Sequence, residues 1–177
     1  MRFNKRLILE MKCLMIVLAF LLLTAEAQSP WETDSLTGKK APDFSLKDIN
    51  DKTISAASLK GNVVLIGFWA TWCPPCRSEM PAMNKLYREF RNKGFEVIAI
   101  SKDRSVTYVK DYLSKTPVDF PILMDPENKA SKAFRVFSLP TSFLVDRNGV
   151  ILELFLGEED WDSTKFRNKI KALLERK

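Results

Sequence analysis

The feature that most constrains the fold is an apolar run at residues 63–70 that leads directly into Trp72-Cys73-Pro74-Pro75-Cys76. The run is rich in β-branched residues and carries no charge, which is typical of a strand buried on both faces. The two prolines suit the first turn of a helix, where missing N–H groups cost little. The sequence therefore predicts a strand that passes into a helix, with two cysteines at the junction that can close a small disulfide.

Further strands and helices are predicted around this junction. A short hairpin is expected within residues 44–61, and Asn148-Gly149 between two apolar runs predicts a second hairpin. A helix follows the cysteines and continues to Phe90, kinked by Pro81, with Gly94 placed to end it. The other predicted elements are strands at 95–101, 120–124, 141–145 and 150–156, and helices at 105–115, 128–137 and 162–176. This order indicates an α/β domain with a central mixed sheet covered by helices.

Two of these helices carry specific predictions about the core. In the helix at 105–115, Val106, Val109, Tyr112 and Leu113 share one face at helical spacing and are expected to point inward. In the helix at 128–137, the inward-facing residues are predicted to be Ala130, Ala133, Phe134 and Phe137.

The first 27 residues have the layout of a secretory signal peptide. A basic start precedes a wholly apolar stretch at residues 13–23, and Ala25 and Ala27 occupy cleavage-site positions. Because this stretch has 11 residues and a bilayer span needs about 20, a cleaved leader is favoured over a membrane anchor. Residues 28–40 are interpreted as a polar linker, and residues 41–177 as one folded domain.

Composition narrows the possible chemistry. The chain contains no histidine, which excludes histidine-based nucleophile pairs, imidazole metal sites and histidine general bases. Without the leader, Cys73 and Cys76 are the only cysteines, whereas a structural zinc site usually needs four nitrogen or sulfur ligands. The net charge of +6 comes from basic residues interspersed with acidic ones, a pattern that favours a solvated surface over nucleic-acid binding. No metal, cofactor or nucleic-acid partner is expected.

The cysteine pair itself is suited to thiol–disulfide exchange. A thiolate is the attacking species, and the N-terminus of a helix favours the thiolate form of Cys73. Cys76 lies one turn into the helix, so it is expected to be more covered and to resolve a mixed disulfide. Glu79 faces the same way as Cys76. Two interpretations of Glu79 remain open: a half-buried proton acceptor with a raised pKa, or an exposed acid stabilised by the helix dipole.

FWATWCPPC, followed by Arg77-Ser78-Glu79-Met80-Pro81, resembles the thioredoxin superfamily, and more narrowly its extracytoplasmic TlpA/ResA/CcmG-like branch. The similarity extends from Ala41-Pro42-Asp43-Phe44 to the last helix. It implies a thioredoxin fold with an N-terminal β-hairpin and a central helix–strand insertion, formed by the segments at 105–115 and 120–124.

The resemblance also implies roles for individual residues. Leu139-Pro140-Thr141 matches the loop in which thioredoxin-fold proteins carry a cis-proline that faces the dithiol. Cytosolic thioredoxins have a buried aspartate six residues before the first cysteine, where this chain has Gly67. ResA-like proteins instead have a glutamate at the place of Glu79. Trp69 is expected in the core, and the substrate-docking residues are predicted to be Trp72, Pro74, Pro75, Leu139, Pro140 and Thr141.

The implied function is that of an exported thiol-disulfide oxidoreductase that reduces or exchanges protein disulfides, for example in cytochrome c maturation. Its partners would be protein thiols and disulfides and a membrane or periplasmic redox donor. The protein would act as a monomer in the bacterial periplasm or on the outer face of the membrane. It would touch the membrane only through an uncleaved N-terminal segment.

Three alternatives compete with this function. A peroxiredoxin-like peroxidase is one, because Ala41-Pro42-Asp43-Phe44 also begins that related group. However, its P-x-x-x-T-x-x-C pattern requires proline and threonine where this chain has Ile66 and Ala70. A general disulfide oxidant is the second, since the cysteine motif does not fix the direction of electron flow. A copper-binding module is the third, although copper chaperones of this superfamily use a longer cysteine spacing and a histidine.

Overall fold

The structure is a computed structural model that describes residues 36–176, so the predicted signal peptide lies outside the described residues. A five-stranded sheet forms its centre, in the order β5-β4-β3-β6-β7. The strands β3, β4 and β5 run parallel, while β6 and β7 are antiparallel to their neighbours. This arrangement confirms the predicted mixed sheet and the hairpin at Asn148-Gly149. The bounds of the strands are Val63–Trp69 (β3), Phe95–Ser101 (β4), Ile122–Met124 (β5), Thr141–Val145 (β6) and Ile151–Leu156 (β7).

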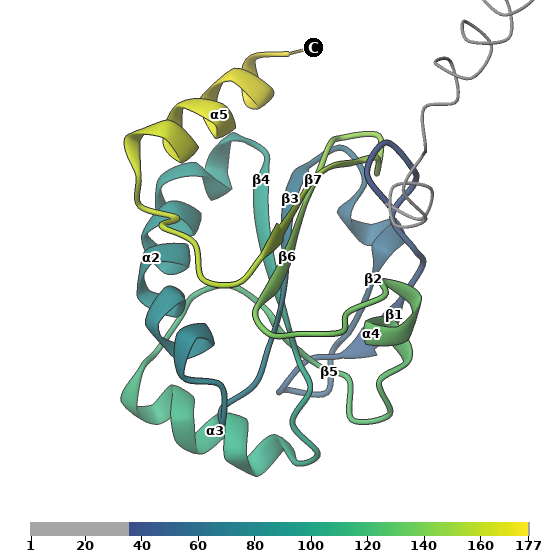
Figure 1. Cartoon of the computed structure of the whole chain (residues 1–177), viewed down its shortest axis with the longest axis vertical. Coiled ribbons are helices and arrows are strands. Elements are labelled where there is room, and N and C mark those ends of the chain that lie inside the picture. Colours follow the sequence, from purple (N-terminus) through teal and green to yellow (C-terminus); the bar gives the residue numbers. More distant parts are fainter. Residues whose placement is uncertain (1–35, 177) are drawn as a thin grey trace, which may run out of the picture. The chain divides into compact units, whose positions relative to one another are not determined.

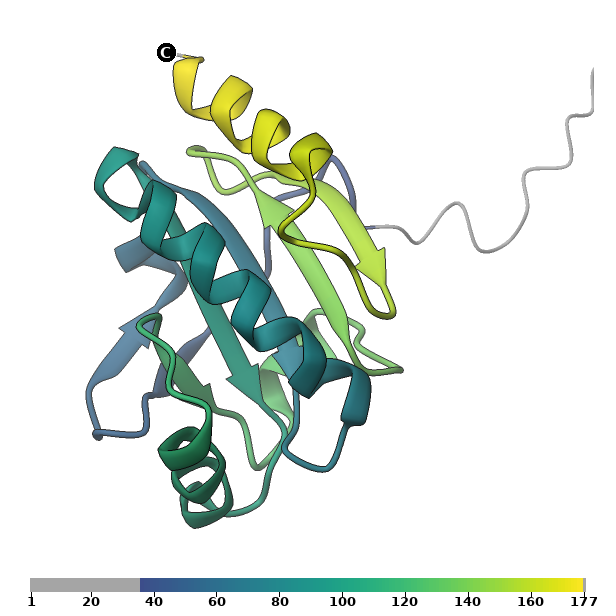
Figure 2. The ribbon, with the colours of Figure 1, turned by 90° about the vertical axis from the view of Figure 1, so that its left-hand side faces the viewer.

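Helices and a hairpin cover the two faces of the sheet (Figures 1 and 2). The helices α2 (Pro74–Phe90) and α5 (Thr164–Glu175) lie on one face, and α3 (Val106–Lys115) packs against the same apolar layer. The opposite face carries α4 (Lys129–Ala133) and the antiparallel pair β1 (Ser45–Lys47) and β2 (Thr53–Ser55), followed by the short 3-10 helix η2 (Ala56–Leu59). The predicted N-terminal hairpin and central helix–strand insertion are thus both present.

Strand β3 divides the core into two apolar layers. All seven of its residues are buried, and successive side chains of a strand point to opposite faces. Val63 and Leu65 therefore pack with the helices α2 and α5. Ile66 and Phe68 pack on the other face, where Phe68 contacts the ring of Phe134 at a centroid distance of 5.3 Å.

Helix α2 begins where the sequence predicts. Cys73 is its N-cap, and Pro74 and Pro75 occupy the first turn. Pro81 lies inside the helix without ending it, and the helix passes into the 3-10 segment η3 (Arg91–Lys93). Gly94 then adopts a φ of 90°, a left-handed conformation that favours glycine.

The predicted helix at 128–137 is wrong in length and in its buried face. Helix α4 ends at Ala133, which is exposed. Arg135 has a φ of 55°, and this left-handed residue breaks the helical period. Phe134 therefore stays buried, whereas Phe137 is 94% exposed. Val106 is also more exposed than predicted, because it is the first residue of α3.

Residues at the end of the predicted linker are bonded to the domain. The N–H of Gly38 donates to the carbonyl of Ile151 over 2.8 Å, and Lys40 pairs with Val150 in an isolated bridge. Leu36 packs against the apolar layer on the α4 face. Within residues 36–176, no helix has both the length and the apolar character needed to cross a membrane.

Candidate active site

The sheet topology brings three loops to one edge. Trp69 at the end of β3 pairs with Ser101 at the end of β4, and Phe68 pairs with Thr141 at the start of β6. The loop after β3, the loop after β4 and the loop before β6 consequently meet. They carry Cys73, Asp103 and Pro140, which are distant in the sequence.

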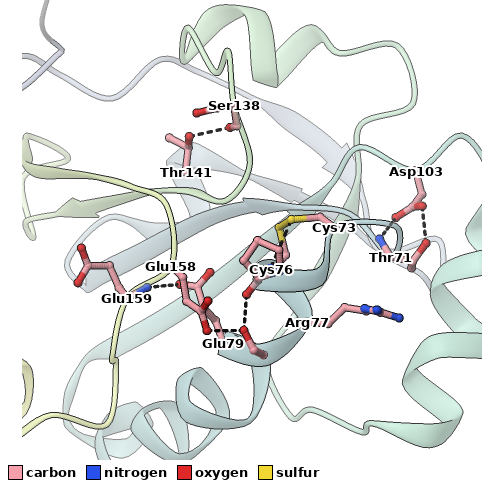
Figure 3. The surroundings of a disulfide bond; sticks show 12 residues. Thr71, Cys73, Cys76, Arg77, Glu79, Asp103, Ser138, Thr141, Glu158 and Glu159 are labelled. Carbon is pink, nitrogen blue, oxygen red and sulfur yellow. Dashed lines mark hydrogen bonds between the residues drawn. A yellow bond between two sulfur atoms is a disulfide. The ribbon is translucent and has the colours of Figure 1, made fainter.

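Cys73 and Cys76 form a disulfide with an S–S distance of 2.06 Å (Figure 3). Cys73 is 4% exposed and Cys76 is 1% exposed. The Sγ of Cys73 accepts a hydrogen bond from the backbone N–H of Cys76 over 3.3 Å. After reduction, this N–H and the positive end of the α2 dipole would stabilise a thiolate on Cys73. The geometry is suited to Cys73 as the attacking sulfur, with Cys76 behind it.

Glu79 is a buried acid beside this pair. Its side chain is 4% exposed, and its Oε1 accepts hydrogen bonds from the indole Nε1–H of Trp161 over 2.6 Å and from the N–H of Glu159 over 3.2 Å. Burial raises the pKa of Glu79 to about 7, against the lowering effect of these two bonds. The position does not fit the interpretation of Glu79 as an exposed acid at the start of a helix.

Cys76 and Glu79 both line a small cavity of about 10 Å³. Gly67, Pro140 and Ser142 also contribute to its walls. A volume of this size is at the lower limit of about 10–15 Å³ that a single water needs. Cys76 and Glu79 thus line one space that is just large enough for a single water.

Little space surrounds Gly67, the position at which cytosolic thioredoxins carry an aspartate. A Cβ added at Gly67 would lie 3.2 Å from Cε of Met83 and 3.3 Å from Oγ of Ser142. Both distances are shorter than ordinary van der Waals contact. In this chain the space next to Gly67 is occupied by the side chains of Met83 from α2 and Ser142 from β6.

On its other side, the disulfide borders an open groove of about 420 Å³. The peptide bond between Leu139 and Pro140 is cis, and Leu139 lies in the groove wall. Thr141 is buried, and its hydroxyl donates to the carbonyl of Ser138 over 2.8 Å, so it shapes this loop without facing the groove. The groove is lined by Trp72, Cys73, Pro74, Pro75, Lys102, Phe137, Ser138 and Leu139.

The predicted docking residues are thus only partly brought together. Trp72, at 67% exposure, stands in the groove, whereas Trp69 is in the core as predicted. Pro140 borders the small cavity instead, and Thr141 lines neither space. Phe137 and Lys102 were missed. Phe137 could have been found from the sequence, because it lies two residues before Leu139, a predicted docking residue.

Asp103 is a further residue that the sequence reasoning missed. It is 3% exposed, and its Oδ2 and Oδ1 accept hydrogen bonds from the N–H and the hydroxyl of Thr71 over 2.9 and 2.7 Å (Figure 3). The hydroxyl of Ser101 donates to the same carboxylate over 2.8 Å. Asp103 therefore fastens the loop that carries Trp72 and Cys73 to the end of β4.

Comparison with known proteins agrees with this geometry. Residues 37–154 match the AhpC/TSA family. A thiol-disulfide oxidoreductase ResA of Bacillus cereus is 41% identical over 122 residues, which cover 69% of this chain and 70% of that protein. Two solved Chlorobium tepidum structures are also similar. One, described as a putative thiol:disulfide interchange protein DsbE, has a TM-score of 0.73 and 35% identity, covering 78% of this chain and 97% of that chain. The other, described as a thiol:disulfide interchange protein of the thioredoxin family, has a TM-score of 0.69 and 31% identity, covering 76% and 95%.

These similarities do not favour the alternatives of a peroxidase or a copper-binding module, because the relatives are named for thiol–disulfide chemistry. The cysteine pair, closed as a disulfide at the start of α2, is the group such chemistry requires. The chain belongs to the AhpC/TSA family, with a thioredoxin fold, and is a thiol-disulfide oxidoreductase.

Proposed function

We propose that the protein reduces or exchanges disulfides of other proteins, with Cys73 as nucleophile, Cys76 as resolving thiol and Glu79 as proton acceptor. The observation that carries the proposal is that Cys76 and the buried Glu79 line the same small cavity. Without a histidine in the chain, a carboxyl group with a pKa near neutrality is the available base.

The reaction begins with the reduced pair. The Cys73 thiolate attacks one sulfur of a substrate disulfide, forming a mixed disulfide and releasing the other substrate sulfur as a thiolate. Cys76 then gives its proton to the carboxylate of Glu79 and attacks the sulfur of Cys73. The mixed disulfide breaks, and the first substrate sulfur leaves as a thiolate. Two electrons pass to the substrate, its two thiolates take up protons, and the Cys73–Cys76 disulfide forms.

An extended substrate segment would dock in the groove, along Leu139 and the cis bond to Pro140. Trp72 and the two prolines of α2 provide apolar surface beside Cys73, which suits transient peptide binding. Leu139 would present its backbone to the substrate, and Thr141 would support this loop from behind through its bond to Ser138.

The proposed location is outside the cytoplasm, as a monomer in the bacterial periplasm or on the outer face of the membrane. The support is the signal-peptide layout of residues 1–27. A periplasmic or membrane redox donor would then re-reduce the pair. N-terminal sequencing of the processed protein tests the leader: a mature chain that starts at Gln28 is expected, and an intact Met1 would show that the leader is retained.

Reductive work, for example in cytochrome c maturation, is proposed over general oxidation. Equilibration of the Cys73–Cys76 pair with glutathione or dithiothreitol buffers measures its potential. A value below about −180 mV, that of protein disulfide isomerase, is expected for a reductase. A more oxidising value would support the alternative of a general disulfide oxidant.

Trapping tests the order of attack. Cys76→Ser, incubated with a disulfide-bonded peptide, should accumulate a mixed disulfide on Cys73 that intact mass spectrometry detects. The matched variant Cys73→Ser should form far less adduct, because the groove is bordered by Cys73 and not by Cys76. Equal trapping by the two variants would show that the roles of the cysteines are not those proposed.

A further inference from the structure

The groove beside Cys73 is apolar and aromatic on its open side. Trp72 and Phe137 are 67% and 94% exposed, and they come from two different segments: the loop before α2 and the loop after α4. Two large aromatic side chains held in water next to a reactive sulfur form a surface that gains stability when a partner covers it. The groove volume of about 420 Å³ lies within the range of about 300–1,000 Å³ that is usual for binding pockets.

The backbone directs Phe137 into this position. Arg135 takes the left-handed conformation with a φ of 55°, which is uncommon for a residue other than glycine. As a result Val136 is buried and Phe137 points outward. Phe137 therefore adds nothing to the packing of the core, and its ring is exposed as part of the groove lining.

The groove also has a definite charge. Lys102 is its one charged lining residue. Within residues 36–176, the ammonium group of Lys102 has no carboxylate partner. The carboxylate of the neighbouring Asp103 is buried and accepts hydrogen bonds from Thr71 and Ser101 instead.

The opposite side of the disulfide carries the opposite charge. Glu158 and Glu159, both exposed, follow β7 on the Glu79 side, away from Thr71 and Asp103 (Figure 3). An acidic peptide residue would be attracted toward Lys102 and repelled from this acidic loop. The charge difference therefore also gives a docked peptide a preferred direction.

We propose that the groove selects protein segments in which a large apolar residue and an acidic residue lie within two residues of the cysteine that Cys73 attacks. Trp72 and Phe137 would hold the apolar side chain, and Lys102 would pair with the carboxylate. An extended peptide advances about 3.3 Å per residue, so both neighbours remain close to the reacting sulfur. This inference rests on the proposed attack by Cys73 and names the class of substrate it prefers.

The test uses disulfide-linked dimers of three synthetic peptides that share one sequence around a single cysteine. The neighbours of the cysteine are phenylalanine and glutamate, serine and glutamate, or phenylalanine and lysine. The kcat/KM of the reduced full-length protein is measured for each. Replacing phenylalanine by serine should lower kcat/KM by about 10-fold. Replacing glutamate by lysine should lower it by about 3- to 10-fold, and about 0.5 M salt should remove most of that difference.

Variants assign each preference to its residue. Phe137→Ser should bring the phenylalanine-to-serine ratio close to one, and Lys102→Gln should do the same for the glutamate-to-lysine ratio. Tyr108→Ser and Lys110→Gln are matched controls on α3, outside the groove, and should keep both ratios. Equal kcat/KM for all three peptides, or ratios that survive in Phe137→Ser and Lys102→Gln, would overturn the inference. Failure of every peptide to react with Cys73 would instead overturn the proposed function.

Discussion

The two sides of the disulfide differ in almost every physical property. The side of Cys76 is closed: it contains a cavity of about 10 Å³ and a buried acid, Glu79. The side of Cys73 is an open groove of about 420 Å³ with exposed aromatic side chains and a lysine. Under the proposed function, this difference would separate proton transfer, on the side of Cys76, from substrate docking, on the side of Cys73. A buried carboxyl keeps a raised pKa only where water is excluded, whereas a protein substrate needs an accessible surface.

The start of helix α2 produces this separation. Cys73 is the N-cap and borders the groove, while Cys76 and Glu79 lie three residues apart on the face that packs against the sheet. Residues at this spacing share one side of a helix. The same few residues thus place one sulfur beside the groove and the other beside the acid.

Removing the acid should have the largest effect on the closed side. In Glu79→Gln, resolution of a mixed disulfide by Cys76 should slow by about 10²-fold, because general base catalysis is typically worth 10²–10⁴-fold. In the wild type, the resolution rate should rise with pH through about 7 as Glu79 loses its proton. Stopped-flow fluorescence after mixing with a peptide disulfide measures this step.

The control for that experiment is Glu175→Gln, an exposed acid at the end of α5, which should resolve at the wild-type rate. If Glu79→Gln kept both the rate and the pH midpoint of the wild type, the two sides of the disulfide would not differ in their proton chemistry.

The same acid should make stability depend on pH. Its pKa is about 7 in the folded protein against 4.5 in the unfolded chain, so the folded state binds more protons between these values. Stability should therefore fall as pH rises from 4.5 to 7, by up to about 3 kcal/mol. Urea unfolding of the oxidised protein across this range, compared with Glu79→Gln, measures the contribution. An unchanged slope in the variant would assign the pH dependence to other groups.

On the groove side, we expect Asp103 to position the loop that carries Trp72 and Cys73, through its hydrogen bonds to Thr71. Asp103→Ala leaves the partly buried N–H of Thr71 without its acceptor and should destabilise the protein by about 1–2 kcal/mol. Because Thr71 leads directly into Trp72 and Cys73, we also expect the redox potential of the pair to change. Asp103→Asn should restore much of both properties, since its amide can bond to the N–H and hydroxyl of Thr71. A loss of stability with an unchanged potential would limit Asp103 to a structural role.

Gly67→Ala should have the smallest effect. The new methyl group would lie 3.2 Å from the flexible end of Met83, which can move by a few tenths of an ångström. A destabilisation of about 1 kcal/mol is expected from overpacking, measured by urea unfolding. A gain in stability would mean that the methyl group fits the cavity beside Cys76, and would contradict our explanation for the glycine.

Local patterns predicted most of the fold and the place of the cysteine pair at the start of α2. The strand at Val63–Trp69, the start of α2 and the hairpin at Asn148-Gly149 depend on neighbouring residues, so periodicity and turn chemistry revealed them. The burial of Glu79 could not be predicted in this way, because it depends on Trp161, which is 82 positions away. Two interpretations of Glu79 stayed open until that contact was known.

The groove shows a second limit of local patterns. Helical spacing predicts Phe137 in the core. The left-handed φ at Arg135 ends the helical spacing, and Phe137 is exposed instead. Arginine gives no sequence signal for this conformation, unlike glycine or asparagine. Asp103 was more accessible to reasoning: it follows a strand parallel to β3, so its loop had to lie near the cysteines.

The central claim is that Glu79 is a buried acid poised near neutrality beside Cys76. The most direct test is a carbon-13 NMR titration of the glutamate side-chain carboxyls in the oxidised protein, with Glu79→Gln to assign the signal. We predict a midpoint near pH 7 for Glu79, well above the values of exposed glutamates, which are about 4.3. A Glu79 signal that titrates together with the exposed glutamates would contradict the account.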